Sequence, residues 1–243
     1  ALRHGIAYGE ESRIEVKKPA FAGSFYPADK LSLQTLVDGF LKDARKDLPD
    51  VPPGVFAVIA PHAGYVYSGK AAAYSYNAVR GKGFNTVVLL GSSHRIPFKG
   101  VALYPSGAWE TPLGRVNIDA VMARKFASLS STIRSLPAAF SEEHSLEVQV
   151  PFLQRTLKDF KIVPLLTGVM EKEDIEALAG ALTTILKQNK GRVLLVVSSD
   201  MSHYHPYSEA VRIDSSTMRL IGELNWEGLL DGINRKENEL CGA

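Results

Sequence analysis

The sequence predicts an α/β fold with a mostly parallel, mixed sheet flanked by helices. Short apolar runs rich in β-branched residues alternate with helix-forming segments along the chain. The runs are continuously apolar, as in parallel strands that are buried on both faces. One stretch near the middle of the chain changes to short segments separated by turn residues. The expected strands are 55–60, 86–90, 161–166 and 193–197.

Helical patterns occupy the segments between these strands. A further helix is expected to begin at Ser141, which can cap it, and to be kinked by Pro151. Between residues 100 and 118, short strand-like segments and a Trp-Glu-Thr-Pro-Leu-Gly turn region predict an antiparallel excursion. The other expected helices are 69–80, 119–129, 171–188 and 208–224.

Length and composition favour one ordinary globular domain. The chain has 243 residues, and we expect a single α/β domain over 17–243 after a flexible N-terminal extension over 1–16. The net charge of +2 gives no reason to expect a nucleic-acid partner, and the absence of a long apolar run argues against a membrane protein. Cys241 is the single cysteine, which excludes an internal disulfide and favours a reducing, cytoplasmic location.

Three of the six histidines follow expected strands. His62, His94 and His203 come shortly after the first, second and fourth strands. Ligands bind outside the carboxyl ends of strands in open parallel sheets, so these imidazoles are expected to meet at one edge. Each could alone be a structural histidine, but three together favour a shared site. Imidazole binds Zn, Fe and Cu, and it also serves as a general acid or base near neutral pH.

A second group of polar residues lies at the start of the helix expected after residue 141. Glu143 and His144 could simply reflect the preference of helix starts for acidic residues, or they could face the histidine site.

Two other motifs give weaker indications of function. Residues 64–71 match a phosphate-binding loop except at Ala71, which has no hydroxyl for Mg²⁺. A serine hydrolase built on Ser199 would lack the Gly-x-Ser-x-Gly motif.

Six ordered motifs together resemble the MEMO family, whose bacterial and archaeal members are also called the B protein of the AmmeMemoRadiSam system. The resemblance covers most of the chain, and the ordered set is more specific than any single motif. The motifs are PAFAGSFYP at 19–27, PHAGYVYSG at 61–69, GSSH at 91–94, EHSLEVQVPFLQ at 143–154, SSDMSHY at 198–204 and LCG at 240–242.

The resemblance implies a fold similar to class III extradiol ring-cleaving dioxygenases of the LigB type, which hold Fe(II) with two histidines and a carboxylate. In the MEMO pattern a cysteine replaces the carboxylate, so the implied ligands are His62, His94 and Cys241. His203 matches the acid/base histidine of the dioxygenases. Tyr67 matches a pocket reported to bind phosphotyrosine peptide in eukaryotic members, where Phe25 is replaced by Trp. Family members run on beyond this cysteine, so a C-terminal family segment is expected to be absent.

We therefore expect a metal-dependent redox protein that holds one Fe(II) or Cu ion and needs no organic cofactor. Asp200 would orient His203. Tyr65, Tyr67, Phe25 and Tyr204 would form an aromatic wall for a small aromatic molecule or a peptide, although plain core packing explains them equally well. The rival hypotheses are a binding module without turnover, and an accessory partner of radical SAM and AMMECR1-type proteins by family analogy. Thiolate in place of carboxylate changes the redox chemistry, so similarity of fold does not establish ring cleavage.

Overall fold

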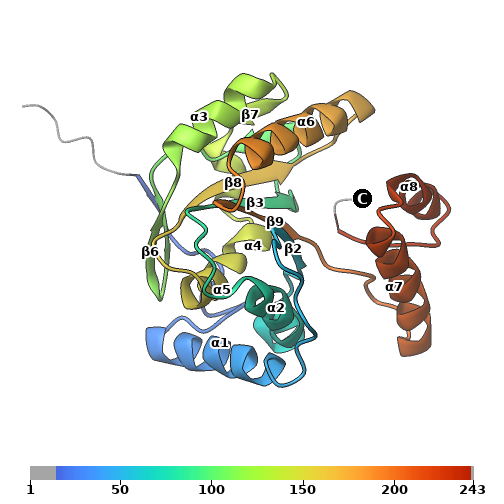
Figure 1. Cartoon of the computed structure of the whole chain (residues 1–243), viewed down its shortest axis with the longest axis horizontal. Coiled ribbons are helices and arrows are strands. Elements are labelled where there is room, and N and C mark those ends of the chain that lie inside the picture. The colour runs from blue at the N-terminus through green and yellow to red at the C-terminus, as the bar shows by residue number, and fades with distance from the viewer. Residues whose placement is uncertain (1–14, 242–243) are drawn as a thin grey trace, which may run out of the picture.

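The computed structural model describes residues 15–241 and contains a six-stranded main sheet (Figure 1). The strand order is β2-β9-β3-β8-β4-β7. The expected flexible extension over 1–16 falls mostly on residues 1–14, outside the described part of the chain. The bounds in sheet order are Ala57–Ala60, Val193–Ser198, Thr86–Ser92, Lys161–Thr167, Val101–Leu103 and Ile133–Ser135.

The four apolar runs chosen from the sequence are confirmed as the four consecutive parallel strands of this sheet. β2 pairs with β9, β9 with β3, and β3 with β8, all in parallel. β4 pairs antiparallel with β8, so the sheet is mixed, as predicted. The carboxyl ends of β2, β9, β3 and β8 therefore lie at one edge, with Ala60 paired to Ser198 and Ser92 paired to Thr167.

A second, three-stranded sheet contains the antiparallel excursion that the sequence predicts. β5 (Ala108–Thr111) and β6 (Gly114–Asn117) form an antiparallel pair, and β1 (Val16–Lys17) adds to β5 in parallel. β4, at the start of the same stretch, instead joins the main sheet.

Helices cover both faces of the main sheet (Figure 1). One face carries α1, α2 and α5, which contact one another, and the other carries α3 and α6. The last two helices, α7 and α8, pack on each other beside the sheet. No helix in the described part of the chain is both long and apolar enough to cross a membrane. The helix bounds are Lys30–Ala44 (α1), Tyr65–Val79 (α2), Ala120–Leu129 (α3), Pro137–Phe140 (η1), His144–Glu147 (α4), Gln149–Thr156 (α5), Lys172–Gln188 (α6), Tyr207–Gly222 (α7) and Trp226–Asn234 (α8).

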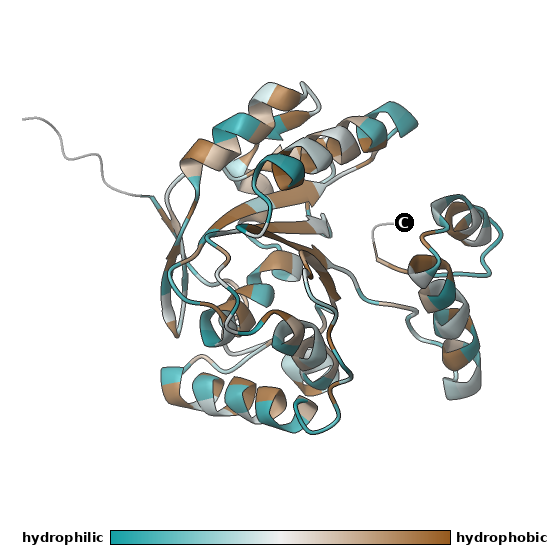
Figure 2. Ribbon diagram, viewed as in Figure 1, coloured by the Kyte–Doolittle hydropathy of each residue, from teal (hydrophilic) through white to brown (hydrophobic). Residues whose placement is uncertain are grey.

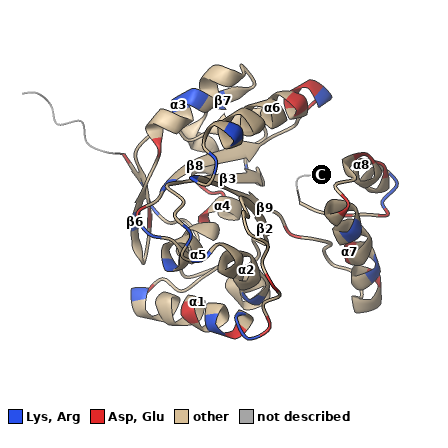
Figure 3. Ribbon diagram, viewed as in Figure 1, with Lys and Arg blue, Asp and Glu red and all other residues tan. Residues whose placement is uncertain are grey.

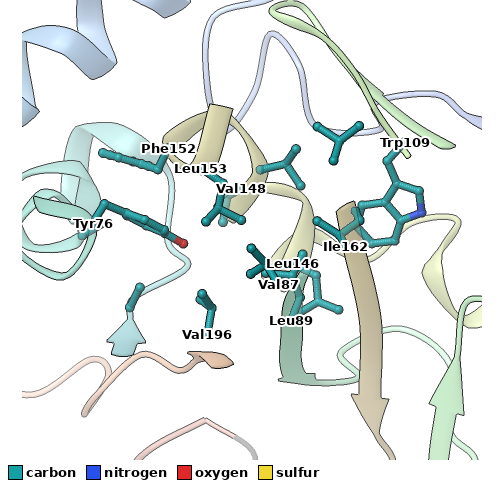
Figure 4. Close-up of a cluster of buried hydrophobic side chains, with 14 of the residues drawn as sticks. Tyr76, Val87, Leu89, Trp109, Leu146, Val148, Phe152, Leu153, Ile162 and Val196 are labelled. Atoms are coloured by element: carbon teal, nitrogen blue, oxygen red, sulfur yellow. The ribbon is translucent and has the colours of Figure 1, made fainter. Parts of the chain in front are cut away.

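The hydrophobic core has a separate cluster on each side of the sheet. Figure 2 shows that the strands are its most hydrophobic part, which agrees with their burial on both faces. On the α2 and α5 side, the rings of Tyr76 and Phe152 stack with their centroids 5.0 Å apart, as Figure 4 shows. On the other side, Phe126 of α3 and Ile185 of α6 are fully buried. The core thus fixes the strands whose ends carry the histidines.

The helix expected to start at Ser141 is organised differently. Glu143, not Ser141, is the N-cap of α4, and its side chain accepts the backbone N–H of Ser145. The helical path breaks at Val148 and not at Pro151, which is the third residue of α5. The first backbone N–H groups of a helix have no partner within it, so proline is tolerated there.

Other differences concern boundaries and missed elements. α2 begins at Tyr65, four residues before the predicted start at 69, and α7 begins at Tyr207 and not at Ser208. The sequence patterns predicted no helix or strand at the positions of α1, β7 or α8. For α1 a signal was present, because Asp29 accepts the backbone N–H of Ser32 as a helix cap.

A buried carboxylate ties the N-terminal segment to α4. Glu147 is only 2% exposed, and it accepts hydrogen bonds from Tyr26 Oη at 2.8 Å and from the backbone N–H groups of Ala20 and Phe21. Lys17 Nζ completes the set as an ion pair at 2.6 Å. A buried carboxylate is stable only when its oxygens are paired in this way. Glu147 therefore anchors the loop that carries Phe25 against the site described next.

Candidate metal centre

The candidate site lies at the edge of the sheet where the parallel strands end. β2, β9 and β3 are consecutive in the sheet, so the loops that follow them are neighbours. These loops carry His62, His203 and His94, and α4 brings His144 from a fourth segment. The convergence predicted for the strand-end histidines thus follows from the strand order.

Three imidazole rings contact one another at the centre of this site. The ring centroids of His62 and His94 are 5.1 Å apart, those of His94 and His144 are 4.6 Å apart, and those of His62 and His144 are 5.3 Å apart. Imidazoles this close repel one another when more than one of them is protonated, so the cluster favours neutral rings, whose lone pairs can bind a cation. The arrangement is therefore suited to a bound metal ion.

A hydrogen-bond network assigns the tautomer of His62. Ser198 Oγ donates to the carbonyl oxygen of Ser145 at 2.6 Å and accepts from Gln149 Nε2 at 2.8 Å. Its only proton is thereby used, so His62 Nδ1, 2.9 Å away, must be the donor to Ser198. The lone pair is then on His62 Nε2. This atom is buried and has no hydrogen-bond partner among the described residues.

His94 is oriented by a different acceptor, Glu143. The carboxylate accepts the His94 backbone N–H at 2.6 Å and approaches Nδ1 at 2.9 Å. Contact with Cys241 and then with Glu143 raises the pKa of His94 to about 10. Burial acts to raise the pKa of Glu143, but its hydrogen bonds with His94 and with the backbone N–H of Ser145, together with the charge of His94, lower that pKa to about 2. The carboxylate thus fixes Nδ1–H and leaves Nε2 to face the site.

Cys241 is held beside these imidazoles by the loop after β9. Its backbone N–H donates to the carbonyl oxygen of Asp200 at 3.0 Å, and its own carbonyl accepts from Ser199 Oγ at 3.2 Å. Its Sγ is 4.0 Å from His203 Nε2. One donor atom each from His62, His94 and Cys241 all lie within 4.8 Å of one another. Two imidazole nitrogens and one sulfur within this span fit a single transition-metal ion.

Asp200 lies between His62 and His203 and contacts both. Its Oδ1 accepts the backbone N–H groups of His62 and Ala63 at 2.6 and 3.3 Å. Its Oδ2 lies 3.8 Å from His62 Nε2 and 3.7 Å from His203 Nε2. Asp200, His203 and Cys241 form a second group whose donor atoms lie within 4.8 Å of one another and which shares Cys241 with the first group.

Comparison with known proteins identifies the family of this chain. A family model described as Memo-like protein matches residues 17–243. The chain belongs to the MEMO family. It is 36% identical over 228 residues to a MEMO1 family protein of Thermoplasma volcanium, with 93% of this chain and 82% of the relative covered. It is 33% identical over 234 residues to one from Pyrobaculum arsenaticum, covering 94% and 83% of the two chains, and 34% identical over 238 residues to one from Sulfolobus acidocaldarius, covering 93% and 84%.

The aromatic residues expected to form one wall in this MEMO-family chain lie in different environments. Tyr65 is buried, and its hydroxyl donates to the carbonyl oxygen of Val148 at 2.6 Å. Tyr67 and Tyr204 are largely exposed. Phe25 contacts the imidazole cluster, with its ring centroid 4.9 Å from that of His144. The structure therefore brings Phe25 to the imidazole cluster, whereas the ring of Tyr204 lies beside that of His203, with the centroids 6.0 Å apart.

His144 takes a more central position than sequence analysis expected for it. His144 Nδ1 is buried without a hydrogen-bond partner among the described residues, 3.4 Å from Glu143 Oε1. Burial lowers its pKa, although the nearby Glu143 charge opposes that shift. His94, Glu143 and His144 form a third group of closely spaced donors. His144 thus contributes directly to the imidazole cluster of this MEMO-family chain.

Sequence analysis missed the residues that orient the expected ligands. Ser198 and Gln149 fix His62, and Glu239 accepts the backbone N–H of His203 at 2.9 Å. Ser198 and Gln149 do lie inside two of the motifs that identify the family, and Glu239 is two positions before Cys241. A motif shows that these residues occur together, but only the three-dimensional contacts show which atom each one orients.

Burial of His62 predicts a loss of stability in acid. Burial lowers its pKa from 6.5 to about 4, against the opposing charge of Asp200. Between these pH values the unfolded chain takes up a proton that the folded chain excludes, so the free energy of unfolding falls as pH decreases from 6.5 to 4. The difference corresponds to about 3 kcal/mol.

Urea unfolding of the metal-free protein between pH 4 and 7 measures this effect. The variant His62→Gln lacks the titrating group and should lose less stability over the same range. If the free energy of unfolding of His62→Gln falls between pH 6.5 and 4 as steeply as that of the wild type, the assignment of a neutral, buried His62 is contradicted.

Proposed function

We propose that this MEMO-family chain is a metal-dependent redox protein. His62 Nε2, His94 Nε2 and Cys241 Sγ would hold one Fe(II) or Cu ion. Two observations at His62 carry the proposal. Its buried Nε2 has no hydrogen-bond partner among residues 15–241, and one of its ring nitrogens lies within 4.8 Å of a donor atom on each of His94 and Cys241. An unpaired polar atom in a protein interior is costly unless a ligand or ion satisfies it.

The donor set indicates which ion fits. Imidazole nitrogen and thiolate sulfur suit iron, copper and zinc, whereas Mg²⁺ and Ca²⁺ require oxygen ligands. Bound iron or copper would supply one-electron redox chemistry and would polarise a ligand. The proposed ligand set would resemble that of LigB-type extradiol dioxygenases, with a thiolate in place of their carboxylate. Oxidation of phenolic or other electron-rich molecules is therefore the first activity to assay.

The chain itself provides a proton-transfer group beside these ligands. His203 Nε2 lies 3.7 Å from Asp200 Oδ2 and 4.0 Å from Cys241 Sγ, while its Nδ1 faces Glu239 Oε1 at 3.8 Å. The side chain is 38% exposed, so it contacts both solvent and the site. We assign His203 the role of moving a proton between the two, with Asp200 and Glu239 orienting its ring.

Replacing His203 by alanine is expected to leave the metal content unchanged and to reduce turnover about 10²- to 10⁴-fold, the contribution typical of general acid–base catalysis. Metal content is measured by inductively coupled plasma mass spectrometry and turnover by an oxygen electrode, with catechol as the first probe. Tyr207→Ala is the control, because it removes an exposed aromatic ring from the same segment and Tyr207 belongs to none of the three donor groups.

The same assay separates the enzyme from the binding module. If the iron- or copper-loaded wild type binds catechol with a fixed stoichiometry and consumes no oxygen, the redox proposal fails in favour of a module that binds without turnover. If His203→Ala consumes oxygen at the wild-type rate, the proton-transfer role of His203 is wrong.

A further inference from the structure

A chain of hydrogen bonds runs from the buried core to the ring of His62. It begins at Tyr76 of α2, which is fully buried against Phe152 and whose hydroxyl points into the core cluster (Figure 4). Tyr76 Oη donates to Gln149 Oε1 at 2.6 Å, and Gln149 Nε2 donates to Ser198 Oγ at 2.8 Å. Ser198 Oγ in turn accepts from His62 Nδ1 at 2.9 Å. Consecutive hydrogen bonds therefore connect a core tyrosine to a proposed metal ligand.

The amide of Gln149 has one favourable orientation in this chain. Besides Ser198 Oγ, its Nε2 faces the backbone carbonyl oxygens of Pro61 and Ser145, at 3.1 and 3.3 Å. With the amide reversed, its oxygen would face these two carbonyl oxygens, which can only accept hydrogen bonds. Gln149 Oε1 therefore faces Tyr76, and the tyrosine hydroxyl is its donor.

Gln149 holds His62 at two points. One hydrogen bond reaches the carbonyl oxygen of Pro61, the residue before His62, and the other reaches Ser198, the acceptor for the imidazole ring. Gln149 is only 1% exposed, so its hydrogen bonds come from the protein and not from solvent. The strands that lead into Pro61 and Ser198, β2 and β9, carry no lysine, arginine, aspartate or glutamate (Figure 3). No charged side chain of these strands competes for the hydrogen bonds of Gln149.

Loss of the Tyr76 hydroxyl would break this chain at its far end. Gln149 Oε1 would become a buried acceptor without a donor, an unfavourable state that the amide can relieve only by moving. Movement of the amide releases Pro61 and Ser198 together, because both bond to the same nitrogen. The effect therefore reaches His62 although three hydrogen bonds separate Tyr76 from its ring.

We propose that Tyr76 and Gln149 are positioning residues for His62, which hold its metal-binding nitrogen in place from within the core. The inference rests on the proposed function, because it concerns a ligand of the proposed metal centre. Tyr76 acts through Gln149, and Gln149 acts through Ser198 and the carbonyl group of Pro61. The affinity of the site for its ion thereby depends on a hydroxyl group in the hydrophobic core.

Tyr76→Phe and Tyr65→Phe are a matched pair of variants for testing the proposal. Both tyrosines are buried, and their rings contact Phe152 at centroid distances of 5.0 and 5.1 Å. Both hydroxyls donate at 2.6 Å, but Tyr65 donates to the backbone carbonyl of Val148, whereas Tyr76 donates to Gln149. The two variants therefore lose the same group from the same core, and only Tyr76→Phe interrupts the chain to His62.

Zinc affinity and the imidazole N–H resonance of His62 are the two readouts. Zn²⁺ is the redox-inactive probe, and its affinity is measured by competition with a chelator. Tyr76→Phe and Gln149→Leu should each bind zinc about tenfold more weakly or worse, as is typical when a residue that orients a metal ligand is lost, whereas Tyr65→Phe should stay within about twofold of the wild type. In the metal-free protein, nitrogen–proton NMR should show the His62 Nδ1–H resonance shifted or broadened in Tyr76→Phe and unchanged in Tyr65→Phe.

The proposal is overturned if Tyr76→Phe and Tyr65→Phe bind zinc equally, since a shared loss would reflect general weakening of the core. It is also overturned if the His62 Nδ1–H resonance is the same in Tyr76→Phe as in the wild type. The wild type separates this proposal from the proposed function. Stoichiometric zinc binding by the wild type, with no difference between the two variants, rejects the positioning role alone, whereas a wild type that binds no zinc rejects the proposed function and the assignment of His62 as a ligand.

Discussion

His62→Ala and His94→Ala are each expected to lose stoichiometric binding of iron and copper. Each removes one of three proposed ligands, and the imidazole that remains cannot compensate because Ser198 and Glu143 hold each ring in its own orientation. Loss of a residue that merely orients a ligand weakens metal binding about 10- to 100-fold, so loss of a ligand should exceed about 100-fold. Metal content after dialysis, measured by mass spectrometry, gives the result.

Two controls make this experiment specific. His205→Ala removes an imidazole outside the donor groups and should retain full metal content. Ser198→Ala keeps the His62 ring but removes the acceptor that fixes its tautomer, and it should show an intermediate loss. Wild-type metal content in both His62→Ala and His94→Ala, with both variants folded, would refute the ligand assignment.

Glu147→Ala is expected to cause the largest loss of stability of any single change considered. Glu147 is almost fully buried, and its removal leaves the Lys17 ammonium and the Tyr26 hydroxyl without their acceptor. The Lys17 side chain is itself only 8% exposed, so its charge would be left poorly solvated. Breaking a buried pair in this way costs about 3–5 kcal/mol. The free energy of unfolding in urea at pH 7 measures the change.

Glu110→Ala is the matched control for this loss. Glu110 also pairs with lysine and arginine side chains, but Lys18 and Arg115 are both largely exposed. Water screens such pairs, so their removal should change the stability much less. Equal losses in the two variants would show that the contacts of Glu147 do not anchor the N-terminal segment. Loss of that anchor should also displace Phe25 from His144.

The sequence was sufficient to predict the parallel core and the meeting of His62 with His94. His203 lies at the same edge, but among the described residues it is grouped with Asp200 and Cys241 and not with the other two imidazoles. Both predictions depend on features that are local in sequence, namely continuous apolar runs and the residues that follow each of them. The prediction for His62, His94 and His203 needed only that these runs form neighbouring parallel strands, which the order β2-β9-β3 confirms. The family motifs added Cys241, which no local pattern connects to the histidines.

The remaining details depend on contacts between distant segments. Glu147 bonds to residues more than 120 positions away, and its neighbours in sequence give no sign of this. Glu143 caps α4, whereas Ser141 ends the preceding 3-10 helix and donates its hydroxyl to the carbonyl oxygen of Ala138. Glu143 also bonds His94, an interaction across 49 positions. Aromatic residues in a loop or helix start are equally typical of a core and of a binding wall, so only the structure separates buried Tyr65 from exposed Tyr67.

The central claim is that two imidazole nitrogens and the Cys241 sulfur converge on one ion. X-ray absorption at the zinc edge of protein loaded with one equivalent of Zn²⁺, a redox-inactive substitute, tests it directly. We expect one sulfur neighbour at about 2.3 Å and imidazole nitrogens at about 2.0–2.1 Å, with the sulfur lost in Cys241→Ser. A wild-type spectrum without sulfur, or with no imidazole contribution, would contradict the claim.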